Sequence, residues 1–280
     1  MHKRSAFTLV ELLVVIAIIA LLMSILLPAM SRVRKQAKSV MDQSNLKQWG
    51  LVFSMYTSDN DGYFHAGWYN TPPATTREEQ WMEALRPYHQ EPDLRLCPMA
   101  TKRASEMGLD PGAGNTFIAW GTFPDLDDCG QPSSWWPIVT ACDYGSFGSN
   151  CFVWNPPPHV EVIQGHLTSN NWRRDDVRGT AFIPLFLDCK WYDGWPDNEE
   201  QPPEYQDQPS GSDPPNGMLR FCVNRHNRYI NCVFLDYSVR RIGLKELWRV
   251  KWHRTFDLTA PLPVAWDDPE HWMFGMRDYD

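Results

Sequence analysis

The chain has 280 residues and a formal net charge of -8, with 34 acidic side chains against 26 Lys and Arg. This acidic balance argues against a general nucleic-acid binder, which would carry a basic surface. Apolar residues make up 43% of the sequence, so most of the chain can bury a core, and the length allows one large domain or two small ones.

An apolar segment starts near the N-terminus and ends at Pro28. Residues 7–27 would span roughly 31 Å as a helix, which matches a hydrocarbon core of roughly 30 Å. A secretory signal peptide has a shorter apolar run followed by a small-residue cleavage site, whereas here a helical pattern continues beyond Pro28. A simple membrane anchor explains the segment except for Glu11, because a carboxylate among apolar neighbours is costly unless a cation pairs with it.

Cleavage just before Phe7 would supply a cation, because it creates an α-amino group four residues from Glu11. The segment KRSAFTLVELL resembles the prepilin processing signal of type IV pilins and type II secretion pseudopilins. This resemblance implies that prepilin peptidase cleaves between Ala6 and Phe7, and that Phe7 is then N-methylated. Gly usually precedes the cleaved bond in this family, and Ala6 stands there in this chain.

The same resemblance implies roles in assembly for Glu11 and Pro28. Glu11 falls at the fifth mature position, where the family keeps an acid that pairs with the amino terminus of Phe7 in a neighbouring subunit and sets axial register. Pro28 falls at the twenty-second mature position, where the family keeps a helix-breaking proline.

Beyond Pro28, apolar residues recur at three- and four-residue steps, which predicts one face of an amphipathic helix. These residues are Val33, Ala37, Val40, Met41, Trp49, Val52, Phe53 and Tyr56. The turn residues from Asp59 to Gly62 predict the end of this helix. The sequence therefore predicts one helix of about fifty residues, with a kink or a melted turn at Pro28.

The segments SNLKQWGLVFSMYTSDNDGYF, LCPMA and YGSFGSN resemble a pseudopilin-like subgroup named for a terminal H-X9-DG motif. His226 is followed by nine residues and then Asp236, and Tyr237 replaces the final Gly. The intervening YINCVFL is predicted to be a strand, which would hold the two side chains about 33 Å apart, too far to share a metal ion. We therefore expect turn or strand-end residues and no metal site, although Asp188 could approach one of the two from a neighbouring strand.

The seven cysteines include no CxxC pair, and in an exported domain such scattered cysteines suggest disulfides. Cys222 and Cys232 flank VNRHNRYIN and would face each other if this segment were a hairpin, so we predict that they pair. Two buried free thiols, or a bond from Cys232 to Cys189, are the alternatives. MLRFCVNRH and LFLDCKWYDGW are predicted strands, and LKELWRVKWHR a short helix.

Residues 196–217 contain six prolines and six acids with no Lys or Arg, which predicts an exposed loop. The loop could meet a basic stretch, residues 240–254, of a neighbouring subunit, or it could gather calcium, as C-terminal acidic loops do in the major pseudopilins that this chain resembles. The prolines spread the acids and make a tight calcium cage the less favoured reading. No other cofactor is expected.

The sequence contains no GxSxG, HExxH, P-loop or GxGxxG signature, so we do not expect an enzyme. The leading hypothesis is a structural subunit of a pilin-like filament, either a type II secretion pseudopilus or a type IV pilus. The alternative is a membrane-tethered module whose exposed tryptophans bind carbohydrate or another surface, since the chain has 14 Trp.

The expected fold class is α+β, with a long N-terminal helix packed against an antiparallel sheet that carries long loops. The expected divisions are a leader (1–6), a transmembrane and assembly helix (7–30), its amphipathic continuation (31–60) and a β-rich extracytoplasmic domain (61–280). The resemblance implies an inner-membrane precursor that later enters a periplasmic or cell-surface filament. The partners it implies are other subunits, prepilin peptidase, an inner-membrane assembly platform and, before assembly, the lipid bilayer.

Overall fold

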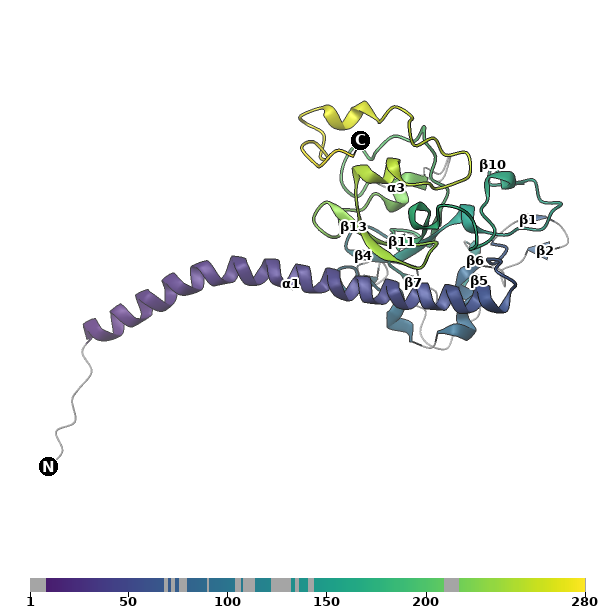
Figure 1. Ribbon diagram of the computed structural model, residues 1–280. Helices are drawn as coiled ribbons and strands as arrows, with labels where there is room; N and C mark the ends of the chain where they lie inside the picture. The colour runs from purple at the N-terminus through teal and green to yellow at the C-terminus, as the bar shows by residue number, and fades with distance from the viewer. Residues whose placement is uncertain are drawn as a thin grey trace.

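The computed structural model describes residues 9–67, 70–71, 74–75, 80–89, 91–103, 107, 114–121, 132–133, 136–140, 144–208 and 217–279. One long helix, α1 (Leu9–Asp59), projects from a globular domain that packs along its C-terminal half (Figure 1). Its 51 residues confirm the predicted length. The helix is continuous through Pro28 and curves along its length instead of melting there.

The end of α1 follows the predicted turn. The amide of Gly62 donates to the carbonyl oxygen of Thr57 at 2.8 Å, and Gly62 has a φ of +81°. This left-handed conformation is accessible to glycine without a steric penalty. The chain can therefore reverse direction directly after α1 and start the domain beside it.

The central sheet has five strands in the order β12-β8-β11-β13-β14. The pairs β8–β11, β11–β13 and β13–β14 are antiparallel, whereas β12 pairs with β8 in parallel, so the sheet is mixed and not wholly antiparallel as expected. These strands are β8 (Phe147–Asn150), β11 (Pro184–Asp188), β12 (Asp193–Gly194), β13 (Tyr229–Phe234) and β14 (Val239–Gly243).

Small two- and three-stranded sheets surround the central sheet. They contain β1 (Asn70–Thr71), β2 (Ala74–Thr75), β3 (Lys102–Arg103), β4 (Ile118–Gly121), β5 (Pro132–Ser133), β6 (Trp136–Thr140), β7 (Tyr144–Gly145), β9 (Val162–Ile163) and β10 (His166–Leu167). The short helices are α2 (Trp81–Ala84), η2 (Arg86–Tyr88), η3 (Pro92–Arg95), η6 (Cys151–Val153), η7 (Thr168–Asn170), η8 (Thr180–Phe182), α3 (Gly217–Phe221), η9 (Lys245–Arg249) and η10 (Val264–Asp267).

Strand β13 separates two hydrophobic cores. Its side chains alternate, as strand geometry requires: Ile230, Cys232 and Phe234 belong to the core that includes α3 and η9, and Val233 belongs to the core beneath α1. Both faces of the strand are therefore buried. This explains why YINCVFL reads as a nearly continuous apolar run, and it confirms the predicted strand.

The buried stripe of α1 differs from the predicted one. Val40 and Met41 are 59% and 58% exposed, whereas Leu46 and an acid, Asp42, are fully buried. Trp49 lies at the centre of the core beneath α1, where its ring meets Trp81 edge-on at 5.3 Å and its Nε1 donates to the carbonyl of Leu94. The period-based prediction was right for residues 49–56 and wrong for residues 33–41.

Two of the predicted C-terminal elements need correction. Part of the predicted strand MLRFCVNRH is the short helix α3, whose first two amides, on Gly217 and Met218, donate to the carboxylate of Glu200 at 2.7 Å. These bonds satisfy helix donors that have no partner within the helix, so a distant loop acid starts the turn. The predicted helix in LKELWRVKWHR is present as the 3-10 helix η9.

Candidate functional site

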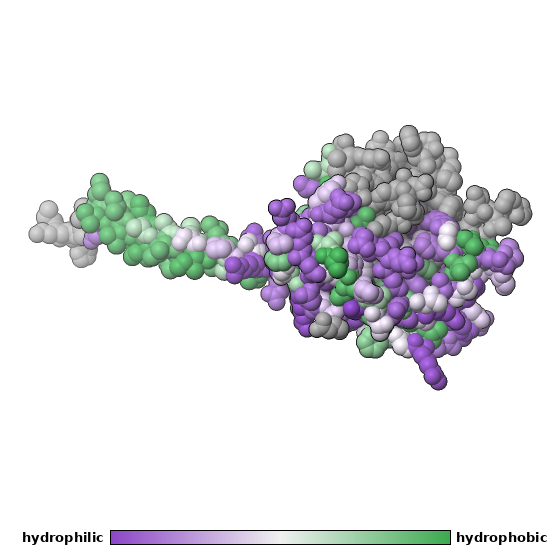
Figure 2. Space-filling view, turned by 90° about the horizontal axis from the view of Figure 1, so that it is seen from above, coloured by the Kyte–Doolittle hydropathy of each residue, from purple (hydrophilic) through white to green (hydrophobic). Residues whose placement is uncertain are grey.

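The first candidate site is the part of α1 outside the domain, which we call the exposed segment, residues 9–38. Every residue in it is exposed, including Glu11 and Pro28. By length and composition α1 is apolar enough to cross a membrane, and its most apolar stretch is not buried in the domain. Figure 2 shows this apolar rod leaving a largely hydrophilic domain. Ala6 and Phe7, the predicted cleavage site, lie outside the described residues.

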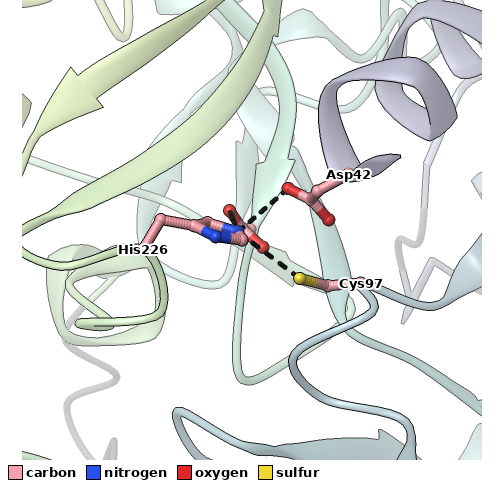
Figure 3. A group of neighbouring side chains, drawn as sticks. Asp42, Cys97 and His226 are labelled. Atoms are coloured by element: carbon pink, nitrogen blue, oxygen red, sulfur yellow. Dashed lines mark hydrogen bonds and ion pairs between the residues drawn. The ribbon is translucent and has the colours of Figure 1, made fainter. Parts of the chain in front are cut away.

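The second candidate site is the buried cluster, which we define as Asp42, Cys97, Asp188 and His226. These residues come from α1, from the segment after η3, from the end of β11 and from the turn before β13. All four are buried, and one nitrogen, sulfur or oxygen atom from each lies within 4.8 Å of the others. Figure 3 shows Asp42 and Cys97 projecting toward the ring of His226.

His226 lies at the centre of the cluster. Its Nε2 is 3.1 Å from Oδ2 of Asp42, 3.2 Å from Oδ2 of Asp188 and 3.4 Å from Sγ of Cys97. The other ring nitrogen, Nδ1, has no hydrogen-bond partner among the described residues, and neither has Oδ1 of Asp42. One imidazole nitrogen therefore faces three potential ligand atoms in a site that is closed to bulk water.

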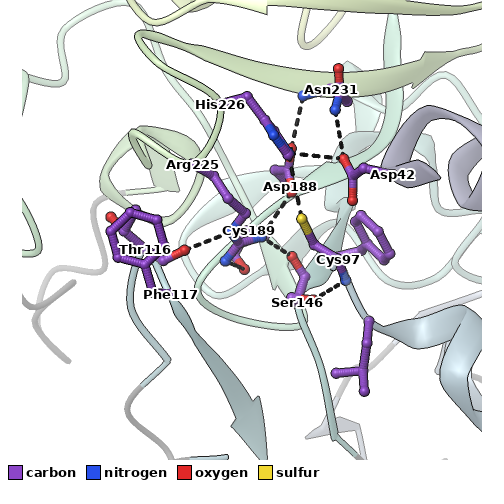
Figure 4. A network of polar contacts seen from close by, with 12 residues as sticks. Asp42, Cys97, Thr116, Phe117, Ser146, Asp188, Cys189, Arg225, His226 and Asn231 are labelled. Atoms are coloured by element: carbon purple, nitrogen blue, oxygen red, sulfur yellow. Dashed lines mark hydrogen bonds and ion pairs between the residues drawn. The ribbon is translucent and has the colours of Figure 1, made fainter. Parts of the chain in front are cut away.

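Arg225 and Asn231 hold the two carboxylates in place (Figure 4). Nη1 of Arg225 donates to Oδ1 of Asp188 at 2.9 Å, and the other donors of this guanidinium bind the backbone carbonyl groups of Asn115, Thr116, Ser146 and Cys189. Asn231 donates its amide to Asp188 at 2.8 Å and its Nδ2 to Asp42 at 2.7 Å. The carboxylates are thus fixed by neighbouring groups as well as by each other.

The charges of the cluster follow from burial and from close partners. Burial lowers the pKa of His226, but the carboxylates of Asp188 and Asp42 outweigh it and raise the pKa to about 9. Burial acts against ionisation of Asp188, yet His226 and Arg225 hold its pKa well below the usual range. Burial and the Asp188 charge raise the pKa of Asp42, and burial followed by the two carboxylates raises that of the Cys97 thiol. At neutral pH the thiol is protonated.

The chemistry open to this cluster is ligation, not nucleophilic attack. A catalytic cysteine must be accessible to its substrate, whereas Cys97 is 0% exposed. The combination of a thiol, an imidazole and two carboxylates is instead a donor set that suits a transition metal ion.

The structure brings together some of the residues that the sequence suggested. His226 is in the cluster, and Asp188 does approach it from the neighbouring strand, as considered above. Asp236 does not: it is exposed in the β13–β14 turn, where it accepts hydrogen bonds from Ser238. Tyr237, which replaces the Gly of the motif, has a φ of 60°, so the turn does need the left-handed conformation that glycine adopts easily.

Sequence reasoning missed Asp42 and Cys97. Asp42 belongs to the buried stripe that continues through Leu46, Trp49 and Phe53, so an acid at a core position of a helix was the available signal. Cys97 lies in LCPMA, a segment noted for its resemblance and not for its chemistry. Neither signal reveals which groups the side chains meet.

The predicted bond between Cys222 and Cys232 is wrong: both are buried free thiols. Their segment is not a hairpin, because Cys222 follows α3 and Cys232 lies in the middle of β13. Sγ of Cys222 contacts the sulfur of Met273 at 3.9 Å, and the thiol of Cys232 donates to the carbonyl of Val233. Cys97, Cys151 and Cys189 are also free, and Cys129 and Cys142 lie outside the described residues.

The acidic loop exposes part of its described residues, as expected, and it is also anchored to the domain. Within residues 196–208, Pro202 and Pro203 are buried, Glu200 binds the first amides of α3, and Asp207 accepts a bond from Thr116. The carbonyl of Pro203 accepts bonds from His271 and Trp272. These contacts tie the described part of the loop to the domain, and calcium binding by its acids stays a prediction.

The basic stretch already has partners in its own chain. Arg240 pairs with Glu246, Lys245 is buried against Asp278, and Arg249 and Arg254 donate to backbone carbonyl groups. These contacts leave less charge for a neighbouring subunit than the sequence suggested. Contact between the two segments of different subunits stays a prediction.

Comparisons with known proteins agree with the resemblance noted for the N-terminal segment. Residues 1–27 match the family model described as "Prokaryotic N-terminal methylation motif". The chain is 40% identical over 63 residues to a protein of Thermus thermophilus named "Type IV wide pilus major component PilA4". This chain is type IV pilin-like or pseudopilin-like. The match covers 22% of the pilin-like chain and 48% of that relative, so it spans about half of the relative's length. No solved structure matches the chain.

Proposed function

We propose that this pilin-like chain is a structural subunit of a filament, held first in a bilayer and then in the filament by the exposed segment of α1. The observation that carries the proposal is the division of one helix into an exposed apolar part and a part buried in a folded domain. In a filament, the exposed apolar side chains would pack against the same segment of neighbouring subunits. The domain would then form the outer surface.

We further infer that prepilin peptidase prepares the subunit. The matched methylation motif supports cleavage between Ala6 and Phe7 and N-methylation of Phe7. Before cleavage the chain would be a single-pass inner-membrane protein. After cleavage an assembly platform in that membrane would pass it into a periplasmic or cell-surface filament. A type IV pilus and a type II secretion pseudopilus both remain within this proposal.

Glu11 would set the register between subunits. It is exposed among apolar neighbours such as Leu9 and Leu12, at 78% and 55% exposure. A carboxylate in this setting is stabilised by a cation, and the charged amino group of Phe7 in a neighbouring subunit would supply one. The pairing would fix how far each subunit lies along the filament axis.

The structure does not favour a carbohydrate-binding module. Among the tryptophans whose side chains are described, nine are buried and none is exposed. Aromatic side chains can bind a sugar only from an accessible face. The described tryptophans fill the cores instead.

The test is Glu11→Gln in the full-length chain, with Glu161→Gln as the matched control. Glu161 is also exposed but lies in the domain, far from α1 in sequence. We expect normal membrane insertion and processing of both variants, and few or misregistered filaments from the Glu11 variant alone, seen by electron microscopy. Intact mass should show loss of residues 1–6 and one added methyl group. Wild-type filaments from Glu11→Gln would remove the register role.

A further inference from the structure

The buried cluster has the spacing of a tetrahedral metal site. In zinc proteins the metal lies about 2.0–2.3 Å from nitrogen, oxygen and sulfur ligands, which places the corners of a tetrahedron roughly 3.3–3.7 Å apart. Nε2 of His226 is 3.1, 3.2 and 3.4 Å from the donor atoms of Asp42, Asp188 and Cys97. The whole set lies within 4.8 Å, so small side-chain rotations would complete the tetrahedron.

The donor types select among metal ions. Calcium and magnesium bind oxygen ligands, and calcium takes six to eight of them, so a site with one sulfur and one nitrogen does not suit either ion. Zn²⁺ binds Cys, His and carboxylate ligands and is four-coordinate in closed structural sites. With four protein ligands and no exposed position, the cluster fits a structural site better than a catalytic one.

The surroundings of the cluster resemble the supporting shell of a metal site. Ligating carboxylates are usually held by further hydrogen bonds that orient them. Arg225 and the amide of Asn231 hold Asp188, and Nδ2 of Asn231 holds Asp42. The amide of Cys97 donates to Oγ of Ser146. Oδ1 of Asp42, which is buried, accepts no hydrogen bond from any described residue.

A divalent metal would take the place of protons in this cluster. Cys binds a metal as the thiolate and His as the neutral imidazole. Zn²⁺ would therefore displace the proton of the Cys97 thiol and a proton held between Nε2 of His226 and the carboxylates, and both would leave to solvent as the metal bonds form. Two positive charges take the place of two protons, so the low-dielectric interior gains no uncompensated charge.

From these observations we propose that Asp42, Cys97, Asp188 and His226 bind one structural Zn²⁺, which fastens α1 to the central sheet. The four ligands come from segments that are far apart in sequence, and Asp42 belongs to α1 itself. Metal binding would therefore couple the position of the long helix to that of β11 and of the turn before β13. This proposal does not depend on filament assembly, and the two fail separately.

The test uses the full-length protein, purified in detergent, stripped with a chelator and then titrated with Zn²⁺ or Co²⁺. We expect one metal ion per chain, a higher unfolding temperature with Zn²⁺, and with Co²⁺ the charge-transfer absorption of a thiolate ligand. Cys97→Ser should abolish this absorption and weaken Zn²⁺ binding by more than the roughly 10–100-fold that loss of a supporting group costs. Cys232→Ser, which removes another buried thiol, should leave both unchanged.

Wild-type protein that retains less than one Zn²⁺ per chain at saturation, or a Co²⁺ spectrum without thiolate absorption, overturns the proposal regardless of how the variants behave. An unchanged spectrum in folded Cys97→Ser also overturns it. If Cys97→Ser does not fold, His226→Gln with circular dichroism as the folding check serves in its place, and the wild-type stoichiometry and spectrum still decide.

Discussion

The two parts of α1 place the same chemistry in different surroundings. The exposed segment, residues 9–38, carries Glu11 among exposed apolar side chains, whereas the anchored segment, residues 39–59, carries Asp42 among buried ones. The structure shows the partners of Asp42 within the chain, on His226 and Asn231. For Glu11 we propose a partner in another subunit. Asp42 thus shows that an acid in an apolar stretch can have partners whose position the sequence does not tell.

The largest expected effect is the difference in stability loss when an apolar side chain is removed from each of the two segments. Trp49→Ala in the anchored segment should lower the free energy of unfolding by about 3–5 kcal/mol, because the ring is fully buried among aromatic neighbours. Leu21→Ala in the exposed segment, where Leu21 is 64% exposed, should leave the domain as stable as before. Thermal and denaturant unfolding of the two variants measures the contrast, and equal losses would contradict it.

A third acid, the partly buried Glu200, tests how burial acts on a carboxylate that is bound by backbone amides. Burial outweighs the backbone amides that bind Glu200 and raises its pKa from 4.5 to about 7. Between these values the folded protein holds a proton that the unfolded chain has lost, so stability falls as the pH rises from 4.5 to 7, by up to about 3 kcal/mol.

The Gln side chain of the Glu200→Gln variant cannot ionise. The unfolding free energy of this variant should therefore fall less over this pH range than that of the wild-type protein. Gln also accepts fewer amides, so the variant is expected to be less stable overall, and the slope is the informative quantity. Unfolding curves at several pH values provide it. A slope identical to the wild type would mean that Glu200 titrates alike in the folded and unfolded chain.

Replacing each acid of α1 with its amide gives the next largest effect. In chelator-treated protein, Asp42→Asn should cost about 1–3 kcal/mol of domain stability, because it removes an acceptor from the buried cluster. Glu11→Gln should leave domain stability unchanged and impair assembly. Unfolding and filament yield are measured on both variants. Domain stability should fall in Asp42→Asn, and filament yield should fall in Glu11→Gln. Loss of domain stability in Glu11→Gln would break the comparison.

The smallest expected effect concerns the contact between the β13–β14 turn and the anchored segment. The hydroxyl of Tyr237 lies 2.8 Å from Oγ1 of Thr57 and donates to Asp175 at 2.8 Å. Tyr237→Phe should cost about 1 kcal/mol by removing these bonds. Tyr237→Gly would also remove the ring that packs against the core beneath α1, so Tyr237→Phe is the variant that isolates the bonds. A loss above 3 kcal/mol in Tyr237→Phe would show a larger role than these bonds explain.

The sequence by itself determined the features that depend on neighbours along the chain. These are the length of α1, its apolar exposed segment, the turn at Gly62 and the strand in YINCVFL, because helical and strand periods and turn residues act locally. Tertiary structure decided the rest. A hydrophobic period does not say which residues a sheet will cover, so Val40 and Met41 were misplaced and Asp42 was overlooked. The spacing of Cys222 and Cys232 suggested a hairpin. It could not show that Glu200, an acid of a distant loop, binds the first amides of a helix, α3, directly before Cys222. The buried cluster draws single residues from four distant segments, and only the packed chain brings their side chains within bonding distance.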